Sequence, residues 1–286
     1  MTNRWNLSVV LFLIVAALAA CATPATPSAP TATSAAAALA SVTPPPQPSA
    51  TPEEHTLTVF AAASLTDAFT ETGAAFEAAN PGVTVVFNFA SSRALRTQIE
   101  EGAVADVFAS ANMKEMDTLA VGGMVGEAQP FVSNMLTIIV PPDNPAGLST
   151  PQDLTRAGLK LVLAAEEVPV GKYAREVLGK LDALYGTGYK DAVLANVVSN
   201  EDTVKQVVAK VQLGEADAGI VYTSDVVAAP ELVSIEIPAE QNVIAVYPIA
   251  VLQGSGEPML AKAFIDYVLS DAGQAVLHAW GFSLPA

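Results

Sequence analysis

The chain has 286 residues, a formal net charge of −16 and a single cysteine. This length is enough for one large or two medium-sized domains with a hydrophobic core. The acidic balance argues against nucleic acid and anionic membrane surfaces as partners. It does not exclude a small anionic ligand, because remote charges are screened within roughly 8–10 Å in salt water and local donors can still bind an anion.

Residues 1–20 have the pattern of a signal peptide. Arg4 precedes an apolar stretch over 7–20 that is too short to span a membrane comfortably. The stretch ends in Leu18-Ala-Ala-Cys21, which resembles the lipobox of bacterial lipoproteins. This resemblance implies that Cys21 is acylated and becomes the new amino terminus; the alternative is an ordinary cleavage site with an incidental cysteine. As the only cysteine, Cys21 leaves the exported part without internal disulfides or cysteine-based metal sites.

Residues 21–54 form a predicted tether. From 22 to 52 the chain is dominated by Ala, Thr, Pro and Ser and has no charged residue. It lacks the bulky apolar residues that a core needs, so we interpret it as an extended linker. Signal peptide, acylated cysteine and tether together place the globular part outside the cytoplasmic membrane, anchored to it.

The folded part is expected to begin with a buried strand followed by a helix. Residues 57–63 are apolar or β-branched and uncharged, which predicts the strand. Ser64 ends the run and Asp67 follows three residues later, the spacing of a capping box that opens a helix reaching about Asn80. A helix start leaves free N–H groups and a positive dipole end, which together favour an anion. The alternative is that Ser64 is only a helix cap.

The same strand-to-helix arrangement recurs three times along the chain. Each later junction combines a predicted strand with small or hydroxyl-bearing residues before a helical pattern. The three strands and their junction residues are 83–89 with Ser91 and Ser92, 159–164 with 168–171, and 192–198 with 199–203.

The remaining pattern predicts an α/β fold with mixed, mostly parallel sheets. Further strands are expected over 105–109, 134–140, 218–222 and 243–252. We also expect a helix that contains Met113 and Met116 as packing residues, and a closing helix over 258–279. The two long strands are candidate crossings between lobe I, 55–136 plus 246–286, and lobe II, 137–245. Ligands of such folds lie beyond the carboxyl ends of the strands, here in the cleft between the lobes.

Several motifs in this order resemble the molybdate-binding component of bacterial molybdate ABC importers. They are Val59-Phe-Ala-Ala-Ala-Ser64-Leu, Phe89-Ala-Ser-Ser92, Ala105-Asp-Val-Phe, Val168-Pro-Val-Gly-Lys-Tyr173-Ala and Gly219-Ile-Val-Tyr222-Thr-Ser-Asp225. The resemblance runs from about residue 56 to Phe282. It implies a two-lobed class II periplasmic-binding-protein fold that closes on a tetrahedral oxyanion. It further implies a monomeric lipoprotein that delivers molybdate, and tungstate as well, to an ABC permease with a cytoplasmic ATPase.

The resemblance also implies which groups hold the anion, without a cofactor or a cation ligand. These are the hydroxyls of Ser64 and Ser92, the backbone N–H groups of Val170 and Thr203, and the hydroxyl of Tyr222. Two positions depart from the commonest family pattern. Val170 stands where Ala is frequent, which matters little if only its N–H is used. Arg93 follows Ser92 where a small residue is frequent, so that it either brings a cation toward the anion or is a solvated residue of the helix.

Such a set of donors suits an anion that has no proton of its own. Molybdate is a dianion at neutral pH and accepts hydrogen bonds only, which hydroxyl and N–H groups provide. Phosphate carries a proton and needs an acceptor. Glu201 and Asp202 lie near the predicted site, so phosphate is disfavoured rather than excluded, although both fit carboxylates at a helix start. Cavity size and ligand reach decide among molybdate, tungstate and sulfate.

Three other classes of function compete with this interpretation. A serine hydrolase would use one of the site serines, but the chain has no G-x-S-x-G elbow, and His55 and His278 do not follow a strand at the site. A ferric iron site would need clustered Tyr, His and carboxylate ligands. Tyr173, Tyr185, Tyr189 and Tyr222 are scattered in the sequence. A purely structural surface lipoprotein would bind no ligand.

Overall fold

The structure, a computed structural model, describes residues 54–285. The predicted signal peptide, Cys21 and the tether up to residue 53 lie outside the described residues and stay predictions. No helix within 54–285 combines the length and the apolar character needed to cross a bilayer.

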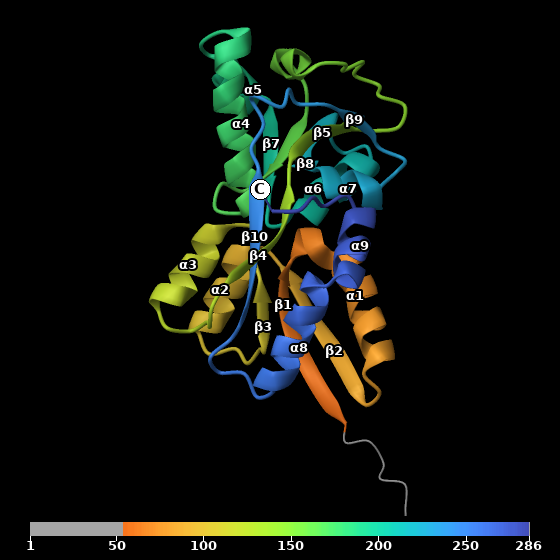
Figure 1. Cartoon of the computed structure of the whole chain (residues 1–286). Helices are drawn as coiled ribbons and strands as arrows, with labels where there is room; N and C mark the ends of the chain where they lie inside the picture. Colours follow the sequence, from red (N-terminus) through yellow and green to blue (C-terminus); the bar gives the residue numbers. More distant parts are fainter. Residues whose placement is uncertain (1–53, 286) are drawn as a thin grey trace, which may run out of the picture. The chain divides into compact units, whose positions relative to one another are not determined.

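Two five-stranded sheets form the framework of this part of the chain (Figure 1). We use lobe I for the sheet with the strand order β2-β1-β3-β10-β4 and its helices, and lobe II for the sheet β7-β6-β8-β5-β9 and its helices. In lobe I, β1 is parallel to β2 and β3, and β10 is antiparallel to β3 and β4. In lobe II, β6 is parallel to β7 and β8, and β5 is antiparallel to β8 and β9. The strands are β1 (His55–Ala62), β2 (Val83–Ala90), β3 (Val107–Ala109), β4 (Gln129–Asn134), β5 (Leu136–Val140), β6 (Leu161–Ala164), β7 (Val197–Glu201), β8 (Ala218–Tyr222), β9 (Val233–Ile235) and β10 (Ala245–Val251).

Helices follow most of the parallel strands and cover both faces of each sheet (Figure 1). In lobe I, α2 and α3 lie to one side and α1, α8 and α9 to the other; in lobe II, α4 and α5 lie opposite α6 and α7. The helices are α1 (Thr66–Ala79), α2 (Ser92–Glu100), α3 (Met113–Val121), α4 (Pro169–Tyr185), α5 (Tyr189–Leu194), α6 (Val204–Gln212), α7 (Thr223–Ala228), α8 (Pro258–Leu269) and α9 (Asp271–Ala279).

Side chains of β1 point alternately to the two faces of the sheet in lobe I, and both faces are covered by other elements. Val59 belongs to the large cluster that includes Phe69 of α1 and Phe264 of α8. Phe60, the next residue, belongs to a second cluster with Leu95 of α2 and Met116 of α3. Successive strand residues point to opposite faces, so a strand that is covered on both sides has an uninterrupted apolar sequence. This explains why 57–63 is apolar or β-branched and contains no charged residue.

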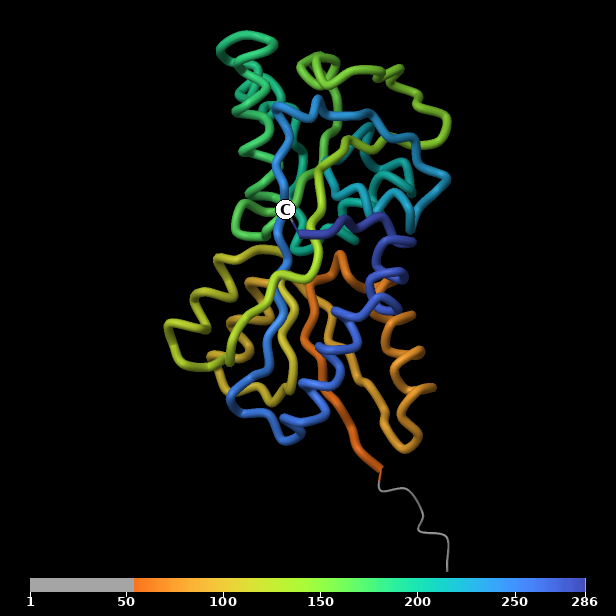
Figure 2. Tube along the Cα trace, in the orientation of Figure 1, coloured from red at the N-terminus to blue at the C-terminus, as the bar shows by residue number. Residues whose placement is uncertain are grey.

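The chain passes between the sheets at two adjacent places, which the tube in Figure 2 shows running side by side. The first passage is at Met135, between β4 and β5, and the second lies in the segment between β9 and β10. The side-chain amide of Asn242 joins them, because it accepts from the N–H of Leu136 (3.1 Å) and donates to the Leu136 carbonyl (2.8 Å). The passages are therefore connected by side-chain to backbone hydrogen bonds.

Three of the predicted elements differ from the structure. Residues 134–140 do not form one strand, because β4 ends at Asn134 and β5 starts at Leu136 in the other sheet. Residues 192–194 are helical, and the strand of this region extends from Val197 to Glu201. A short apolar run of this kind fits a buried helix as well as a strand, and the fold decides between them.

The predicted closing helix is also divided. It breaks at Ser270, whose hydroxyl accepts from the N–H of Gly273 and so starts α9. A Cβ on Gly273 would lie only 2.2 Å from the Tyr267 carbonyl oxygen, so the tight turn between α8 and α9 requires glycine. The break lets α9 return against α1 instead of continuing along the axis of α8.

Candidate functional site

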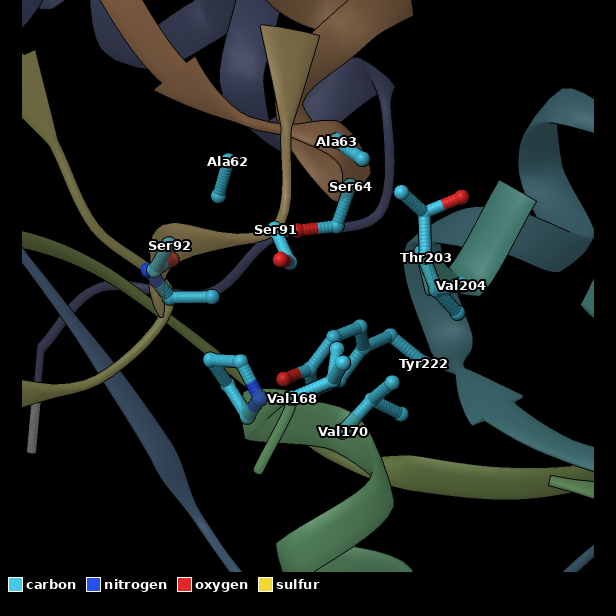
Figure 3. Close-up of a pocket in the computed structure, with 12 residues that line it drawn as sticks. Ala62, Ala63, Ser64, Ser91, Ser92, Val168, Val170, Thr203, Val204 and Tyr222 are labelled. Atoms are coloured by element: carbon cyan, nitrogen blue, oxygen red, sulfur yellow. The ribbon is translucent and has the colours of Figure 1, made fainter. Parts of the chain in front are cut away.

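All five sequence-predicted site residues line one small cavity between the lobes (Figure 3). Lobe I and lobe II each contribute six lining residues. They are Ala62, Ala63, Ser64, Ser91, Ser92 and Ala111 from lobe I, and Val168, Pro169, Val170, Thr203, Val204 and Tyr222 from lobe II. The space available to the centre of a water-sized sphere is about 20 Å³, a little more than the roughly 10–15 Å³ that one water needs. The cavity therefore suits a compact ligand of a few heavy atoms.

Ser64 follows β1 but does not form the predicted capping box. It lies in a short 3-10 helix, Ala63–Leu65, and the residue that precedes α1 is Leu65, which makes no side-chain cap. The extra turn moves the hydroxyl of Ser64 away from the N–H of Asp67 and toward the protein interior. There it lies 3.0 Å from the hydroxyl of Tyr247. The capping-box prediction for Ser64 and Asp67 is therefore wrong, because a buried hydroxyl partner replaces the helix cap.

Tyr247 is a site-supporting residue that the sequence did not reveal. It lies on β10, is fully buried, and packs edge-to-face against Tyr222 with ring centroids 5.8 Å apart. Burial raises the pKa of the Tyr247 phenol far above its ordinary value, so the hydroxyl stays protonated. The only available signal was a tyrosine in an otherwise apolar strand, and nothing in the local sequence connects it with Ser64, which is 183 residues away.

Ser91 and Ser92 divide two tasks at the start of α2. Ser91 caps the helix by accepting from the N–H of Ala94. Ser92 is almost fully buried, and its oxygen accepts from the N–H of Ala111 at 2.9 Å. Because this bond uses Ser92 as the acceptor, its own proton can be donated to a ligand in the cavity.

Val170 lies in the first turn of α4, where backbone N–H groups have no partner inside the helix. The start of this helix approaches the end of β6 very closely. A Cβ on the neighbouring Gly171 would lie 2.0 Å from the carbonyl oxygen of Ala165, so only glycine fits there. The close approach fixes where the first turn of α4 meets the cavity. The polar group that Val170 can offer there is its backbone N–H, because its side chain is apolar.

Thr203 lines the cavity, but its polar groups are already engaged. Its hydroxyl accepts from the N–H of Gln206 at 3.3 Å, and its own N–H donates to the Gln206 side-chain oxygen at 3.1 Å. This reciprocal arrangement is a capping box at the start of α6. The predicted Thr203 N–H would have to exchange Gln206 for the anion, whereas the N–H of Val204 lies at the first helical position beside it.

Tyr222 provides the clearest unsatisfied donor. Its hydroxyl is buried and has no hydrogen-bond partner within residues 54–285. Figure 3 shows it pointing into the space between the lobes. Burial, followed by the neighbouring Tyr247 and Tyr173, raises the pKa of Tyr222 well above its ordinary value, so the group is a proton donor at neutral pH. A buried hydroxyl without a partner costs free energy, which a ligand that accepts from it would recover.

No charged side chain is among the twelve residues that line the cavity. Arg93 is half-exposed and pairs with Glu167 of lobe II at 3.1 Å instead of entering the cavity. Glu201 pairs with Lys210 at 2.7 Å, and Asp202 lines an outer depression that includes Arg93. The cavity therefore offers neutral donors and no carboxylate.

The two histidines are engaged away from the cavity. His55 bonds Glu257, and Nδ1 of His278 contacts the carbonyl oxygen of Phe282, so neither histidine lines the cavity. Within the part of the chain that the structure describes, no group of His, Cys, Asp and Glu is arranged to hold a metal ion. The serines at the cavity thus lack a neighbouring histidine base.

Residues 57–283 match the family described as bacterial extracellular solute-binding protein. The chain belongs to this family. This membership confirms the interpretation as a binding protein rather than a serine hydrolase. The chain is also 42% identical over 231 residues to the molybdate-binding protein ModA of Mycobacterium tuberculosis strain H37Rv, covering 80% of this chain and 85% of that protein. The sequence resemblance to the molybdate-binding components is thereby confirmed.

Solved structures of other binding proteins have the same two-lobed architecture as this solute-binding protein. The periplasmic molybdate-binding protein of Azotobacter vinelandii matches with a TM-score of 0.71 and 23% identity, over 80% of this chain and all of the other. The sulfate-binding protein SubI of Mycobacterium tuberculosis H37Rv matches with a TM-score of 0.70 and 20% identity, over 80% and 86% of the two chains. At these identities the likeness concerns the fold alone, and it confirms the predicted α/β periplasmic-binding-protein class.

The buried carboxyl of Asp225, next to the site, leads to a pH prediction. Burial raises its pKa from 3.8 to about 6, although Lys205 and the N–H of Tyr222 act in the opposite direction. The native state therefore binds this proton more tightly than the unfolded state, so the stabilising contribution is present at low pH and is lost as the pH rises through 6. Relative to an Asp225→Asn variant, the free energy of unfolding of the native protein should increase by about 1 kcal/mol between pH 7 and pH 5.

Urea unfolding at both pH values measures this difference. Asp266→Asn is the matched control, because Asp266 is an exposed residue paired with Lys262. A native-minus-Asp225→Asn difference that stays constant with pH would contradict the assignment.

Proposed function

We propose that this solute-binding protein captures molybdate, and tungstate as well, outside the cytoplasmic membrane and delivers it to an ABC permease with a cytoplasmic ATPase. The observation that carries the proposal is the convergence of neutral donors from both lobes on one ion-sized cavity without a carboxylate. The proposed contacts are the hydroxyls of Ser64, Ser92 and Tyr222 with the N–H groups of Val170 and Thr203, the last of which exchanges the Gln206 side-chain oxygen for the anion. The 42% identical ModA relative supports the choice of anion.

Donors without acceptors select an anion that is fully deprotonated. Hydrogen bonds to a charged group contribute roughly 1.5–3 kcal/mol each, and a proton on the ligand would instead face a donor. The first turns of α2, α4 and α6 add positive dipole ends at the same place. Hydrogen phosphate is disfavoured because neither predicted acceptor lines the cavity. Glu201 is held by Lys210, and Asp202 lines the outer depression.

Capture is proposed to proceed by lobe closure. Lobe I, 55–136 plus 246–286, and lobe II, 137–245, would approach each other about the two passages at Met135 and Asn242. Only the closed form places donors of both lobes around the anion, so the ligand shifts the population toward closure. In this proposal the protein acts as a monomer, needs no cofactor, and is anchored to the membrane through an acylated Cys21.

Sulfate is the second candidate ligand. It is also a dianion without a proton at neutral pH, so the same donors suit it, and a sulfate-binding protein shares the fold. Sulfate is smaller than molybdate, and the fit of the cavity around the anion would separate the two.

Calorimetric titration of the purified protein with molybdate, tungstate, sulfate and phosphate tests the proposed ligand. We expect one-to-one binding of molybdate and tungstate with micromolar or lower dissociation constants, and much weaker heats from sulfate and phosphate. Preferential binding of sulfate would keep the site and change the ligand. Absence of heat from all four would contradict oxyanion capture.

Replacement of Ser92 by Ala should weaken molybdate binding by roughly 10- to 100-fold, because one hydrogen bond to a charged group is lost. The N–H of Ala111 also loses its acceptor, so a modest decrease in Tm is expected without unfolding. Ser270→Ala is the matched control, because it removes another helix-start hydroxyl that does not line the cavity. Unchanged affinity in Ser92→Ala would remove Ser92 from the site.

Tyr247→Phe should weaken molybdate binding by roughly 10-fold even though Tyr247 does not line the cavity. The variant keeps the aromatic ring but removes the hydroxyl that lies against Ser64, which leaves the Ser64 hydroxyl free to rotate. Titration of this variant is compared with Tyr267→Phe, whose ring packs against Phe76 elsewhere in lobe I. Equal affinities of the two variants would show that Tyr247 does not support the site.

A further inference from the structure

Lys205 connects three of the segments that carry the proposed ligand contacts. Its Nζ lies 2.7 Å from Oδ2 of Asp67 and 3.4 Å from Oδ1 of Asp225. In sequence, Asp67 is three residues after Ser64, Asp225 is three residues after Tyr222, and Lys205 itself is two residues after Thr203. None of the three charged residues lines the cavity, so the cluster lies behind the site rather than in it.

The two ion pairs of Lys205 differ in what they join. Asp225 and Lys205 both belong to lobe II, at the starts of α7 and α6. Asp67 belongs to lobe I, in the first turn of α1. The Lys205–Asp67 pair therefore crosses between the lobes, whereas the Lys205–Asp225 pair stays within one lobe and can persist when the lobes separate.

Because this cluster is partly buried, leaving one of its charges unpaired costs more free energy than it would in an ordinary surface pair. The side chain of Asp225 is fully buried, and its Oδ1 has no hydrogen-bond partner within residues 54–285. A buried carboxylate without a compensating cation is strongly destabilising, and the Lys205 amine is the cation that faces it. Burial lowers the pKa of Lys205, but Asp225 and Asp67 together raise it above its ordinary value, so the amine stays charged.

A second pair crosses between the lobes, but it is less suited to control closure. Arg93 and Glu167 lie 3.1 Å apart with side chains that are 48% and 53% exposed. Lys205 and Asp67 are 30% and 38% exposed. Exposed pairs are screened and contribute little, while less exposed pairs are screened less.

From these contacts we propose that Lys205 is a positioning residue for oxyanion capture. Its bond to Asp67 forms as the lobes close and fixes the spacing between the Ser64 segment of lobe I and the Thr203 and Tyr222 segments of lobe II. Lys205 makes no contact with the anion; it stabilises the closed form in which both sets of donors reach it. This inference rests on the proposed function, namely oxyanion capture by lobe closure.

A double-mutant cycle on binding tests the inference. Dissociation constants and dissociation rates for molybdate are measured for the native protein, Lys205→Met, Asp67→Asn and the double variant. Each single variant should bind roughly 5- to 10-fold more weakly, mainly through faster dissociation, and the double variant should bind no more weakly than Lys205→Met. Asp67→Asn is the critical variant, because it leaves the Lys205–Asp225 pair intact and so keeps lobe II unperturbed.

The unfolding transition of the ligand-free protein separates positioning from simple stabilisation. Lys205→Met should lower the Tm because Asp225 loses its cation. The coupling between Lys205 and Asp67 should be large when the cycle is calculated from binding constants and much smaller when it is calculated from the Tm values of the ligand-free variants. Lys210→Met is the matched control: Lys210 lies on the same helix and pairs with Glu201 at 2.7 Å within lobe II. Its affinity for molybdate should equal that of the native protein.

The outcomes distinguish this inference from the proposed function. If the native protein binds none of the four oxyanions, the proposed function fails and the inference fails with it. If the native protein binds molybdate and Asp67→Asn binds it equally well, only the role of Lys205 is overturned. Strictly additive losses in the double variant, or an equal loss in Lys210→Met, would also overturn it.

Discussion

The hydroxyl of Tyr222 is buried without a hydrogen-bond partner within residues 54–285, and the rest of the site can be understood from this constraint. A protein interior rarely tolerates an unsatisfied polar group, because its desolvation is not compensated. Here the unsatisfied donor points into a cavity that also receives Ser64, Ser92 and the first turn of α4. In the proposed function, an anion that accepts from these donors recovers the cost of leaving them incompletely bonded.

The sheet topology brings these donors together. Parallel strands β1 and β2 in lobe I, and β6 and β8 in lobe II, end at the edge of each sheet that faces the other lobe (Figure 1). The helices that follow them therefore begin around the same cavity. In the proposed capture, neutral dipoles rather than a cation supply the attraction, which would let a chain with a net charge of −16 hold an anion. The charged residues of the cleft pair with one another outside the cavity.

Local patterns predicted much of this arrangement, and their failures have physical reasons. The strand before Ser64 and the helix starts at Ser92 and Val170 could be predicted from the sequence. Apolar runs and cap residues determine local structure within a few positions of the chain. The strand predicted over 192–198 failed because a short apolar run has no decisive period. The capping box at Ser64 failed because a tertiary contact with Tyr247 competed with the local one.

The sequence by itself determined the α/β class, the family and five of the twelve residues that line the cavity, because recurring strand-to-helix junctions and their motifs are local features. Only the tertiary structure decided how the hydroxyl of Ser64 is held, that Arg93 pairs with Glu167, and that the N–H of Thr203 is already bonded by its own helix. It also decided that Lys205 joins segments 138 residues apart. Contacts of this kind depend on how the two lobes pack against each other, and the spacing of residues along the chain does not reveal that packing.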